Sequence, residues 1–540
     1  MCGFLAIIGK GVDGRLAAEL SKRMAHRGPD ESDMFITPEG HILCHERLSI
    51  IDLHAGKQPI QGSSTAYMVH NGEIYNHMTL RQGVLKGHTF RSQSDSEVIV
   101  HLYEQYGYDF VHLLDGDFAF VVVDGDRFIA GRDPIGVKPL YYGIDARGRY
   151  YFASEMKAMA DQCTSLSTFP PGHYYTPETG FVKYYQPQYE AENPLQLPVD
   201  YAQLREALTE ATRKRLMSDV PLGVLLSGGL DSSLTSAIAS RLLKAEGKSL
   251  HSFSIGLDPQ APDAKAARKV AEFLGTEHHE IHFTIEEGIQ ILEKLVWHLE
   301  TYDVTSIRAS TPMYFLAQAI TRMGIKVVLS GEGADEVFGG YLYFRNAPTI
   351  EDFRKETVER VQRLFTADLL RADKSTMAHG LEARVPFLDQ DFLEVAMAID
   401  AQDKMPSTYQ GIEKYILRKA FDTPEDPYLP HEVLWRQKEQ FSDGVGYNWI
   451  DTLIAYGTAQ VSDDMMAQAA ELYPYNTPTT KEAYFYRSLF HKHYPQPSAA
   501  QTVRKWIPKW QENTDPSGRA NAAHSCADTQ IAQPGAALAS

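Results

Sequence analysis

The stretch Leu-Leu-Ser-Gly-Gly-Leu-Asp-Ser-Ser, residues 225–233, decides the fold of the larger part of this chain. It ends the apolar run 220–226 and opens a helical pattern over 231–245, so the sequence predicts a tight strand-to-helix turn. Glycine lets backbone N–H groups face an anion, and a helix N-terminus adds positive potential. We therefore interpret the turn as a phosphate-binding loop, although its spacing differs from the GxxxxGK(S/T) pattern of Walker loops.

The side chains of this loop divide into hydroxyl donors and one acid. Ser227 and Ser232 supply donors, while Gly228 and Gly229 free the backbone. Asp231 cannot itself favour phosphate, so we interpret it as a ligand of Mg²⁺, which neutralises pyrophosphate. The alternative is a Gly-Gly turn that only joins a strand to a helix.

Strands and helices alternate after residue 201, which is typical of a doubly wound, parallel α/β sheet. The region from about 350 to 495 reads as mainly helical and would close over that sheet. We assign 201–515 to this domain and expect the Ala- and Ser-rich tail 516–540 to be disordered. The expected strands are 220–226, 250–257, 278–283 and 325–329, and the expected helices are 201–217, 231–245, 263–274, 286–299 and 311–323.

The N-terminal part, residues 2–186, reads differently. Short apolar runs end in Asp and Gly turns, and two amphipathic helices are expected, over 14–25 and 94–106. This mixture predicts a layered α+β domain. The Pro-rich, polar stretch 187–200 has the composition of a linker between the two domains.

Bulk properties narrow the class of protein. The formal net charge of −18 argues against sequence-independent nucleic-acid binding, which needs a cationic surface. The sequence has no apolar run of the roughly 20 residues needed to cross a membrane, and its start reads as a buried strand and not as a signal peptide. No cysteines are paired as CxxC, so neither a zinc–thiolate site nor a disulfide framework is expected. We therefore expect a cytoplasmic protein.

The loop at 225–233 resembles the pyrophosphate loop of the N-type ATP pyrophosphatases, which have an adenine nucleotide α-hydrolase-like fold. These enzymes split ATP between its α and β phosphates and adenylate a substrate. A second stretch, Ser-Gly-Glu-Gly-Ala-Asp-Glu at 330–336, matches another signature of that family. The resemblance implies nucleotide contacts from Leu226, Ile255, Ser330 and Gly331. It also implies a role for Glu332 near the acyl-adenylate, and Asp335 could help to hold Mg²⁺. Alternatively, these acids only cap the following helix.

Cys2 is a candidate nucleophile because of its position. Removal of Met1 would leave a free α-amine, which titrates near pH 8 and can act as general base to the thiol of its own residue. By itself, a cysteine here is more often an apolar residue of a first strand.

Residues 2–185 resemble the class II, N-terminal-nucleophile glutamine amidotransferases, which implies a four-layer αββα domain. The matching stretches are 26–30, 47–50, 71–76 and 94–97. The resemblance implies that Cys2 attacks the glutamine amide and that Asn71 and Gly72 hold the oxyanion. It further implies that Arg47 binds the substrate α-carboxylate. Asp95 would receive the α-ammonium, and Glu73 would help to position it. Each residue also has a plain structural reading, as an ion pair, a hairpin turn or a helix cap.

Nearly the whole chain resembles the glutamine-hydrolysing asparagine synthetase family, through the motifs above and the stretches 300–312, 382–389 and 435–444. The resemblance implies L-aspartate, ATP and L-glutamine as substrates, a protected passage for ammonia, and a homodimer. It places Thr305 and Arg308 in the synthetase site and implies that Lys438 stabilises phosphate charge. Arg384 reads equally well as a buried structural partner.

Two other functions stay open at this point. A paralogous amide synthetase could adenylate a different carboxylate, and a nucleotide-binding regulator could keep vestigial sites. His278, His279 and His282 share one expected strand, and we interpret them as structural because the three lack carboxylates at fixed spacing.

Overall fold

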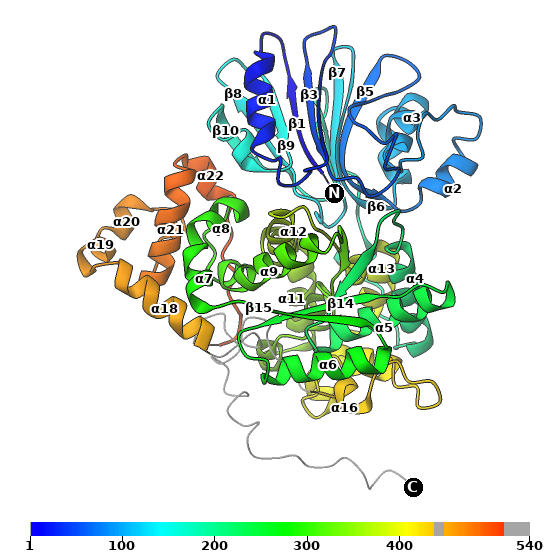
Figure 1. Ribbon diagram of the computed structural model, residues 1–540, viewed down its shortest axis with the longest axis vertical. Coiled ribbons are helices and arrows are strands. Elements are labelled where there is room, and N and C mark those ends of the chain that lie inside the picture. Colours follow the sequence, from blue (N-terminus) through cyan, green and yellow to red (C-terminus); the bar gives the residue numbers. More distant parts are fainter. Residues whose placement is uncertain (1, 437–447, 512–540) are drawn as a thin grey trace.

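A computed structural model describes residues 2–436 and 448–511 of the chain. Figure 1 shows two regions, one above the other, with the N-terminus at their boundary. The upper region contains two antiparallel sheets, and the lower region is built around a parallel sheet.

The first upper sheet has the strand order β10-β8-β9-β1-β3-β2. Its strand β1 alternates strictly: Phe4 and Ala6 face the second sheet, and Leu5 and Ile7 face helix α1 (Gly14–Lys22). Successive side chains of a strand point to opposite faces of its sheet, so the consecutive apolar side chains of β1 bury both faces. The strands are β1 (Gly3–Ile8), β2 (Glu31–Ile36), β3 (Ile42–Arg47), β8 (Tyr141–Asp145), β9 (Tyr150–Ala153) and β10 (Cys163–Thr168).

The second upper sheet has the order β12-β11-β7-β6-β5-β4 and packs face to face on the first. Helices α2 (His77–Gln82) and α3 (Glu97–Tyr106) lie near its outer face, and α3 packs on it, so the layers run αββα (Figure 1). This confirms the four-layer fold expected from the sequence. The strands are β4 (Ile60–Gln61), β5 (Ala66–Ile74), β6 (Gly116–Asp124), β7 (Arg127–Arg132), β11 (His173–Thr176) and β12 (Gly180–Lys183).

The lower sheet has the order β15-β14-β13-β16-β17, and all its neighbouring strands are parallel. The doubly wound sheet predicted from the alternation is therefore confirmed. Helices α5 (Leu230–Ala245) and α6 (Pro262–Leu274) follow β13 and β14 as crossovers, after the entry helix α4 (Tyr201–Lys214). The strands are β13 (Leu222–Leu225), β14 (His251–Gly256), β15 (Glu277–His282), β16 (Val327–Leu329) and β17 (Glu382–Arg384).

Two predicted helices differ from the observed ones. The stretch 286–299 forms two helices, α7 (Ile285–Gln290) and α8 (Leu292–Leu299). The helix expected over 311–323 is α9 (Val304–Arg322), which starts seven residues earlier and contains Pro312 in its interior. Proline has no N–H for the carbonyl four residues before it. Here the Trp449 indole N–H donates to that carbonyl, on Arg308, at 3.0 Å.

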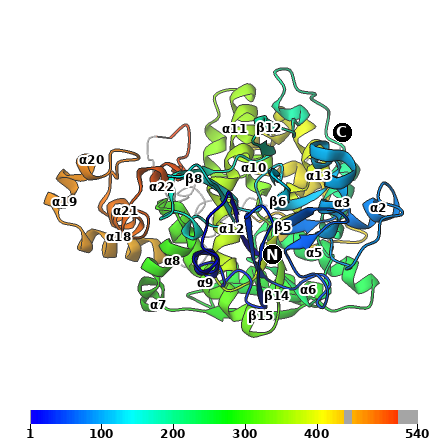
Figure 2. The same ribbon diagram turned by 90° about the horizontal axis from the view of Figure 1, so that it is seen from above.

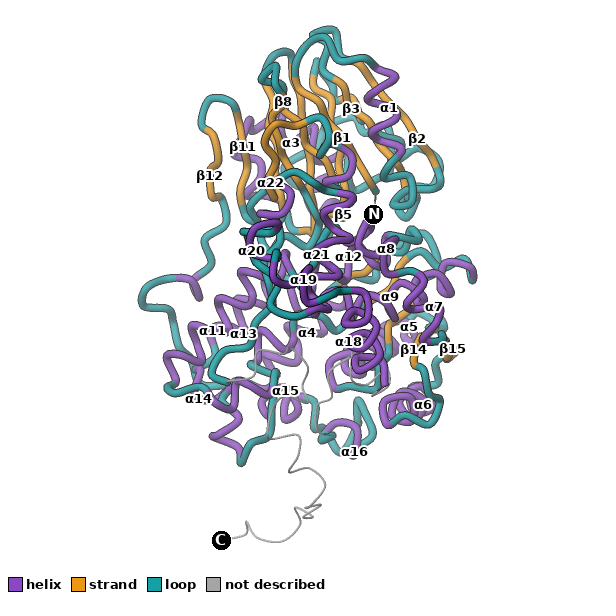
Figure 3. The backbone as a smooth tube through the Cα atoms, turned by 90° about the vertical axis from the view of Figure 1, so that its left-hand side faces the viewer, coloured by secondary structure: helices purple, strands orange, loops and turns teal. Residues whose placement is uncertain are grey.

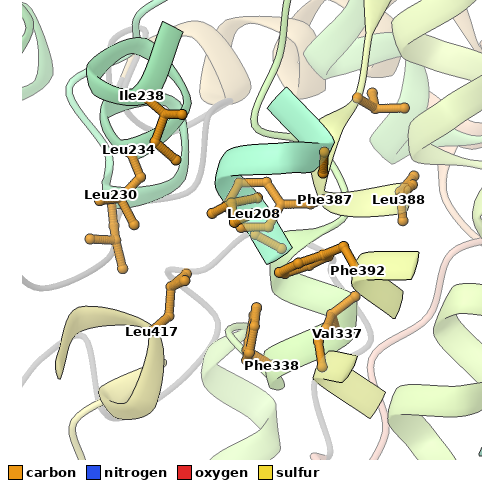
Figure 4. Close-up of a cluster of buried hydrophobic side chains, with 14 of the residues drawn as sticks. Leu208, Leu230, Leu234, Ile238, Val337, Phe338, Phe387, Leu388, Phe392 and Leu417 are labelled. Atoms are coloured by element: carbon orange, nitrogen blue, oxygen red, sulfur yellow. The ribbon is translucent and has the colours of Figure 1, made fainter. Parts of the chain in front are cut away.

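Short helices after β16 close over the sheet, as the sequence predicted for this region. Val337, Phe338, Phe387 and Phe392 pack against α4 and α5 in the largest apolar core (Figure 4). Four later helices, α18 to α21, lie to one side of the molecule (Figure 2). The helices are α10 (Ala334–Phe338), α11 (Ile350–Arg363), α12 (Asp368–Met377), α13 (Gln390–Ala398), α14 (Ala401–Lys404), α15 (Tyr415–Ala420), α16 (His431–Leu434), α18 (Asn448–Gln460), α19 (Asp463–Ala467), α20 (Ala469–Leu472), α21 (Lys481–His493) and α22 (Pro497–Gln501).

The segment 187–200 is packed against the lower region. Tyr189 is buried, and the Leu197 N–H donates to the Ala398 carbonyl at 2.8 Å, so the segment runs along the end of α13. None of the helices in the described ranges combines the length and apolar character needed to cross a membrane.

Candidate active sites

Cys2 lies at the start of β1, at the end of the upper sheets that faces the lower region (Figure 1). Its backbone N–H donates to the Asn71 side-chain oxygen at 2.9 Å. That bond fixes the Asn71 amide, and the Asn71 Nδ2 atom is buried without a hydrogen-bond partner among the described residues. A buried donor without a partner costs free energy, so a ligand oxygen that accepts from Asn71 Nδ2 beside the thiol would be stabilised.

Gly72 follows Asn71 in β5 with a φ of +147°. A Cβ at this position would lie 2.0 Å from the Asp117 carbonyl oxygen, so only glycine fits. The close approach of β6 therefore holds the Asn71-Gly72 backbone in place beside Cys2.

The thiol environment opposes ionisation. Burial raises the pKa of the Cys2 thiol, and the positive charge of the nearby Arg47 guanidinium compensates only in part. The Arg47 guanidinium is held by Glu31 at 2.8 Å and donates to the Asp52 carbonyl at 2.5 Å. Thiolate formation at Cys2 therefore requires a base.

Two buried carboxyl groups complete this pocket. Burial raises the pKa of Asp95 to about 6, although its carboxylate accepts the Ile74 N–H at 2.7 Å. Burial and the neighbouring Glu382 and Asp95 raise the pKa of Glu73 well above its usual range. The structure thus brings the buried residues Cys2, Arg47, Asn71, Glu73 and Asp95 together with the half-buried Gly72.

A cavity of about 200 Å³ lies in the lower region at the carboxyl ends of β13, β14 and β16. Ligands of open α/β sheets gather at such ends. Of the residues predicted for the synthetase half, the cavity is lined by Leu226, Ser227, Gly229, Asp231, Ser232, Ile255, Thr305, Ser330, Gly331, Glu332 and Asp335.

The loop at 227–232 is organised around the start of α5. The Ser227 and Ser232 hydroxyls lie 2.9 Å apart, and the N-cap residue Gly229 provides no side-chain cap, so the first-turn amides stay available to an anion. Gly228, with a φ of +80°, does not line the cavity. It packs on α6 instead, where a Cβ would lie 2.6 Å from the Asp263 carbonyl oxygen.

Two cations that the motifs did not reveal balance the acids of this cavity. Lys414 Nζ lies 2.5 Å from Asp231 and 2.6 Å from Asp335. Arg371 contacts both oxygens of Glu332, at 2.9 and 3.0 Å. Both cations come from segments without a recognisable motif, α12 and the residue before α15, so only the fold brings them to the loops.

Arg308, Thr305 and Lys438, the remaining residues predicted for the synthetase site, differ in where they lie. The Arg308 guanidinium is buried and pairs with both oxygens of Glu482, at 3.0 and 2.6 Å, and Arg308 does not line the cavity. Thr305 does line it, and its buried hydroxyl has no hydrogen-bond partner within the ranges that the structure describes. Lys438 lies outside the described residues.

Buried ion pairs and hydrogen bonds join the two regions. Arg384 is fully buried, contacts Glu73 of the upper pocket and donates to the Arg215 and Met217 carbonyls of the lower region. Arg384 is therefore a structural partner that touches the candidate glutamine pocket. The contacts across the boundary include Arg384–Glu73 (3.3 Å), Arg27–Asp373 (2.7 Å), Lys374–Tyr141 (2.6 Å) and Arg215–Asp117 (3.4 Å).

Fold and sites together define a class of protein. An αββα domain that starts at a buried cysteine, joined to a doubly wound domain with an anion-binding loop, is typical of a glutamine amidotransferase fused to an ATP-using synthetase. In comparisons with known families, residues 1–182 match the glutamine amidotransferase domain, and residues 203–359 and 345–514 match asparagine synthase. The chain belongs to the asparagine synthase family.

Curated relatives match almost end to end. Proteins named asparagine synthetase (glutamine-hydrolyzing) from Asparagus officinalis and Zea mays are each 50% identical, over 96% and 98% of this chain and 92% and 94% of their own lengths. A probable asparagine synthetase (glutamine-hydrolyzing) from Dictyostelium discoideum is 51% identical over 97% of this chain and 99% of its own length.

Proposed function

We infer that this protein makes L-asparagine from L-aspartate, ATP and L-glutamine and releases AMP, pyrophosphate and L-glutamate. The observation that carries this function is the identity of about half of all residues with glutamine-hydrolysing asparagine synthetases over 96% or more of the chain. The two sites supply the two half-reactions that this chemistry needs.

In the upper pocket, Cys2 attacks the side-chain amide of glutamine. Its own α-amine takes the thiol proton, which requires Cys2 to be the first residue of the mature chain. The tetrahedral oxyanion lies against Asn71 Nδ2 and the Gly72 N–H, and the buried unpaired donor of Asn71 supports that role. Ammonia leaves with the added proton, and water then cleaves the thioester to glutamate. Arg47 binds the substrate α-carboxylate, and Asp95, positioned with Glu73, binds the α-ammonium.

In the lower cavity, the β-carboxylate of aspartate attacks the α-phosphorus of ATP, and pyrophosphate leaves. Leu226 and Ile255 flank the nucleotide, and the loop Ser227 to Ser232 with the α5 N-terminus holds the pyrophosphate. Ammonia from the upper site attacks the aspartyl-adenylate beside Glu332, which Arg371 orients, and AMP leaves. We assign to Lys438 the stabilisation of charge on the phosphates. We place Thr305 at the acyl group and Arg308 among the residues that support α9.

The acids of the cavity fit a divalent cation. One oxygen each of Asp231 and Asp335 lies within 2.6 Å of a single ammonium centre, Lys414 Nζ, so both carboxylates can converge on one positive charge. Carboxylate oxygens are preferred Mg²⁺ ligands. We propose that these residues hold Mg²⁺, which neutralises charge on the pyrophosphate.

We also propose the organisation that accompanies this function. The glutaminase domain spans 2–186, a linker spans 187–200 and the synthetase domain spans 201–515. The tail 516–540 lies outside the described residues. The buried, unpaired thiols of Cys44 and Cys163 support a reducing, cytoplasmic location. A homodimer is the common state of such enzymes.

Transfer of labelled nitrogen tests the function. Glutamine labelled with ¹⁵N in its side-chain amide, together with aspartate and ATP, should yield asparagine labelled in its amide and one pyrophosphate per asparagine. Other carboxylates, including glutamate and succinate, should release no pyrophosphate above background. Pyrophosphate release with one of these and not with aspartate would instead identify a synthetase of a different amide.

A further inference from the structure

We propose that His251, Glu277 and His279 form a binding site for a transition-metal ion of the zinc class on the edge of the lower sheet. His251 lies at the start of β14, and Glu277 and His279 lie in β15, the edge strand of the sheet (Figure 3). The site is separate from the acids of the nucleotide cavity, because His251 is at the amino end of its strand and Ile255, which lines the cavity, is near the carboxyl end.

The register of the two parallel strands creates this cluster. His251 pairs with Glu277, and Phe253 pairs with His279. Since side chains alternate between the faces of a sheet, residues 251, 253, 277 and 279 lie on one face. His278, on the opposite face, hydrogen-bonds to Ser252 and Ser254 and takes no part. The three strand histidines that the sequence grouped together therefore lie on two faces. His279 is joined by Glu277 of its own strand and by His251 of the neighbouring strand.

The distances fit one ion. His251 Nδ1 lies 3.2 Å from His279 Nε2, and Glu277 places one oxygen 3.6 Å from His251 Nδ1 and the other 3.7 Å from His279 Nε2. Ligands at about 2.0–2.2 Å from a tetrahedral zinc ion lie roughly 3.3–3.6 Å from one another. Small rotations of the three side chains therefore suffice to place an ion between them.

Neighbouring side chains hold His279 in place, and one side of the proposed metal site is open to solvent. The Phe253 ring stacks on His279 with ring centroids 5.0 Å apart, and Phe253 packs in turn against Leu316 and Ile320 of α9. The side chains of His251, Glu277 and His279 are 30%, 63% and 23% exposed, so solvent can supply a fourth ligand. Two imidazoles and one carboxylate are a set that favours zinc over magnesium or calcium.

Occupancy would join the edge strand to its neighbour. Among the strands that the structure describes, β15 pairs only with β14, so a metal that bridges His251 to Glu277 and His279 adds a link at the edge of the sheet. An ion that binds only the folded state stabilises that state according to its free concentration. Activity should not depend on the ion, because none of the three residues lines the nucleotide cavity.

Cobalt and zinc binding to the full-length protein tests the proposal. Metal-free protein, with excess Mg²⁺ to occupy carboxylate-only sites, is titrated with Co²⁺ while visible absorption is recorded, and Zn²⁺ is then added as competitor. We expect a saturable tetrahedral Co²⁺ spectrum that Zn²⁺ displaces, and a zinc-dependent rise in the unfolding temperature. His279→Gln and Glu277→Gln should each weaken binding at least about tenfold and remove the rise in unfolding temperature.

His282→Gln is the matched control, since His282 lies in the same strand on the face opposite to His279, where its Nδ1 atom is 3.2 Å from the Gly256 carbonyl oxygen. It should keep both signals. Equal metal binding by the wild type and the His279→Gln and Glu277→Gln variants, or no tetrahedral Co²⁺ spectrum in the wild type, would overturn the site.

Discussion

The glutamine pocket and the nucleotide cavity are built in different ways. The upper pocket is a buried cluster whose residues lie at the start of β1, at the end of β3, in β5 and just before α3. The Asn71 Nδ2 atom has no hydrogen-bond partner there among the described residues. The lower cavity of about 200 Å³ gathers charges from distant segments that already pair with one another, such as Lys414 with Asp231 and Asp335. We therefore expect a ligand of the upper site to fill an unused contact at Asn71, and a ligand of the lower site to exchange partners with Lys414.

The largest expected effect is that of a substitution at Cys2, which should abolish the use of glutamine but not the use of ammonia. Cys2→Ala should lower glutamine-dependent asparagine formation by a factor on the order of 10⁴ or more, because the nucleophile is lost. Synthesis from added ammonia should stay within about twofold of wild type. Both rates are measured as asparagine formed per enzyme at saturating aspartate and ATP. A parallel loss with ammonia would show that the sites are not independent.

A smaller effect should follow from Asn71→Asp. The substitution keeps an oxygen that can accept the Cys2 N–H but removes the donor nitrogen, so the oxyanion loses one hydrogen bond. Loss of one such donor costs about 10²–10³ in kcat. The kcat of glutaminase is the quantity to measure, with KM as control. A change confined to KM would mean that Asn71 binds the ground state and not the oxyanion.

In the lower site, Lys414→Met should lower ATP-dependent pyrophosphate release by about 10²-fold, because Asp231 and Asp335 would face the phosphates without their shared cation. Lys414→Arg keeps the charge and should recover part of the rate. Lys419→Met is a control on α15, since Lys419 is partly exposed and pairs with Asp422. Glutaminase activity should not change in any of the three, and a loss there with Lys414→Met would assign the residue to overall folding.

The sequence predicts the upper pocket more completely than the lower cavity, because the pocket is formed by local motifs and the cavity also by distant segments. Local motifs predicted that Cys2, Asn71 and Asp95 lie together. The structure brings them into one cluster, in which the Cys2 N–H donates to Asn71 and Asp95 accepts the N–H of Ile74, from the same strand as Asn71. The motif at 330–336 likewise predicted a second loop at the cavity, and Gly331 lies so close to the first loop that a Cβ would be 2.7 Å from the Ser232 nitrogen. Contacts within such motifs depend on the backbone conformation of a few neighbouring residues, which the sequence predicts.

The sequence motifs did not predict contacts between segments that are distant in the chain. Nothing around Lys414 or Arg371 marks either as a partner of an acid more than 35 residues away in the chain. Arg308 read as a site residue from its motif, yet its guanidinium pairs with Glu482, 174 residues later. The start of α9 was also missed, because a proline inside a helix normally breaks it, and the Trp449 indole that satisfies the freed carbonyl comes from α18.

The smallest effect concerns pH and the upper site alone. Burial raises the pKa of Asp95 from 3.8 to about 6, so the free enzyme loses this negative charge as the pH falls below about 6. Glutaminase kcat/KM should then fall by up to about tenfold per pH unit, because the α-ammonium of glutamine loses its partner. The same shift has the opposite sign for folding: a folded-state pKa above the unfolded value contributes stability at low pH that is lost as the pH rises from 3.8 to about 6.

Asp95→Asn identifies the group that titrates. The variant should have a lower kcat/KM for glutamine at pH 8 and no inflection near pH 6, and its adenylation rate should match that of the wild type across the range. Glu73 lies in the same pocket, and the pKa of its carboxyl is also raised by burial, then by Glu382 and Asp95. An inflection that persists in Asp95→Asn and disappears in Glu73→Gln would transfer the role of ammonium partner to Glu73. The comparison would then change, because Glu73 is the residue that Arg384 of the lower region contacts, and glutamine binding would depend directly on the other domain.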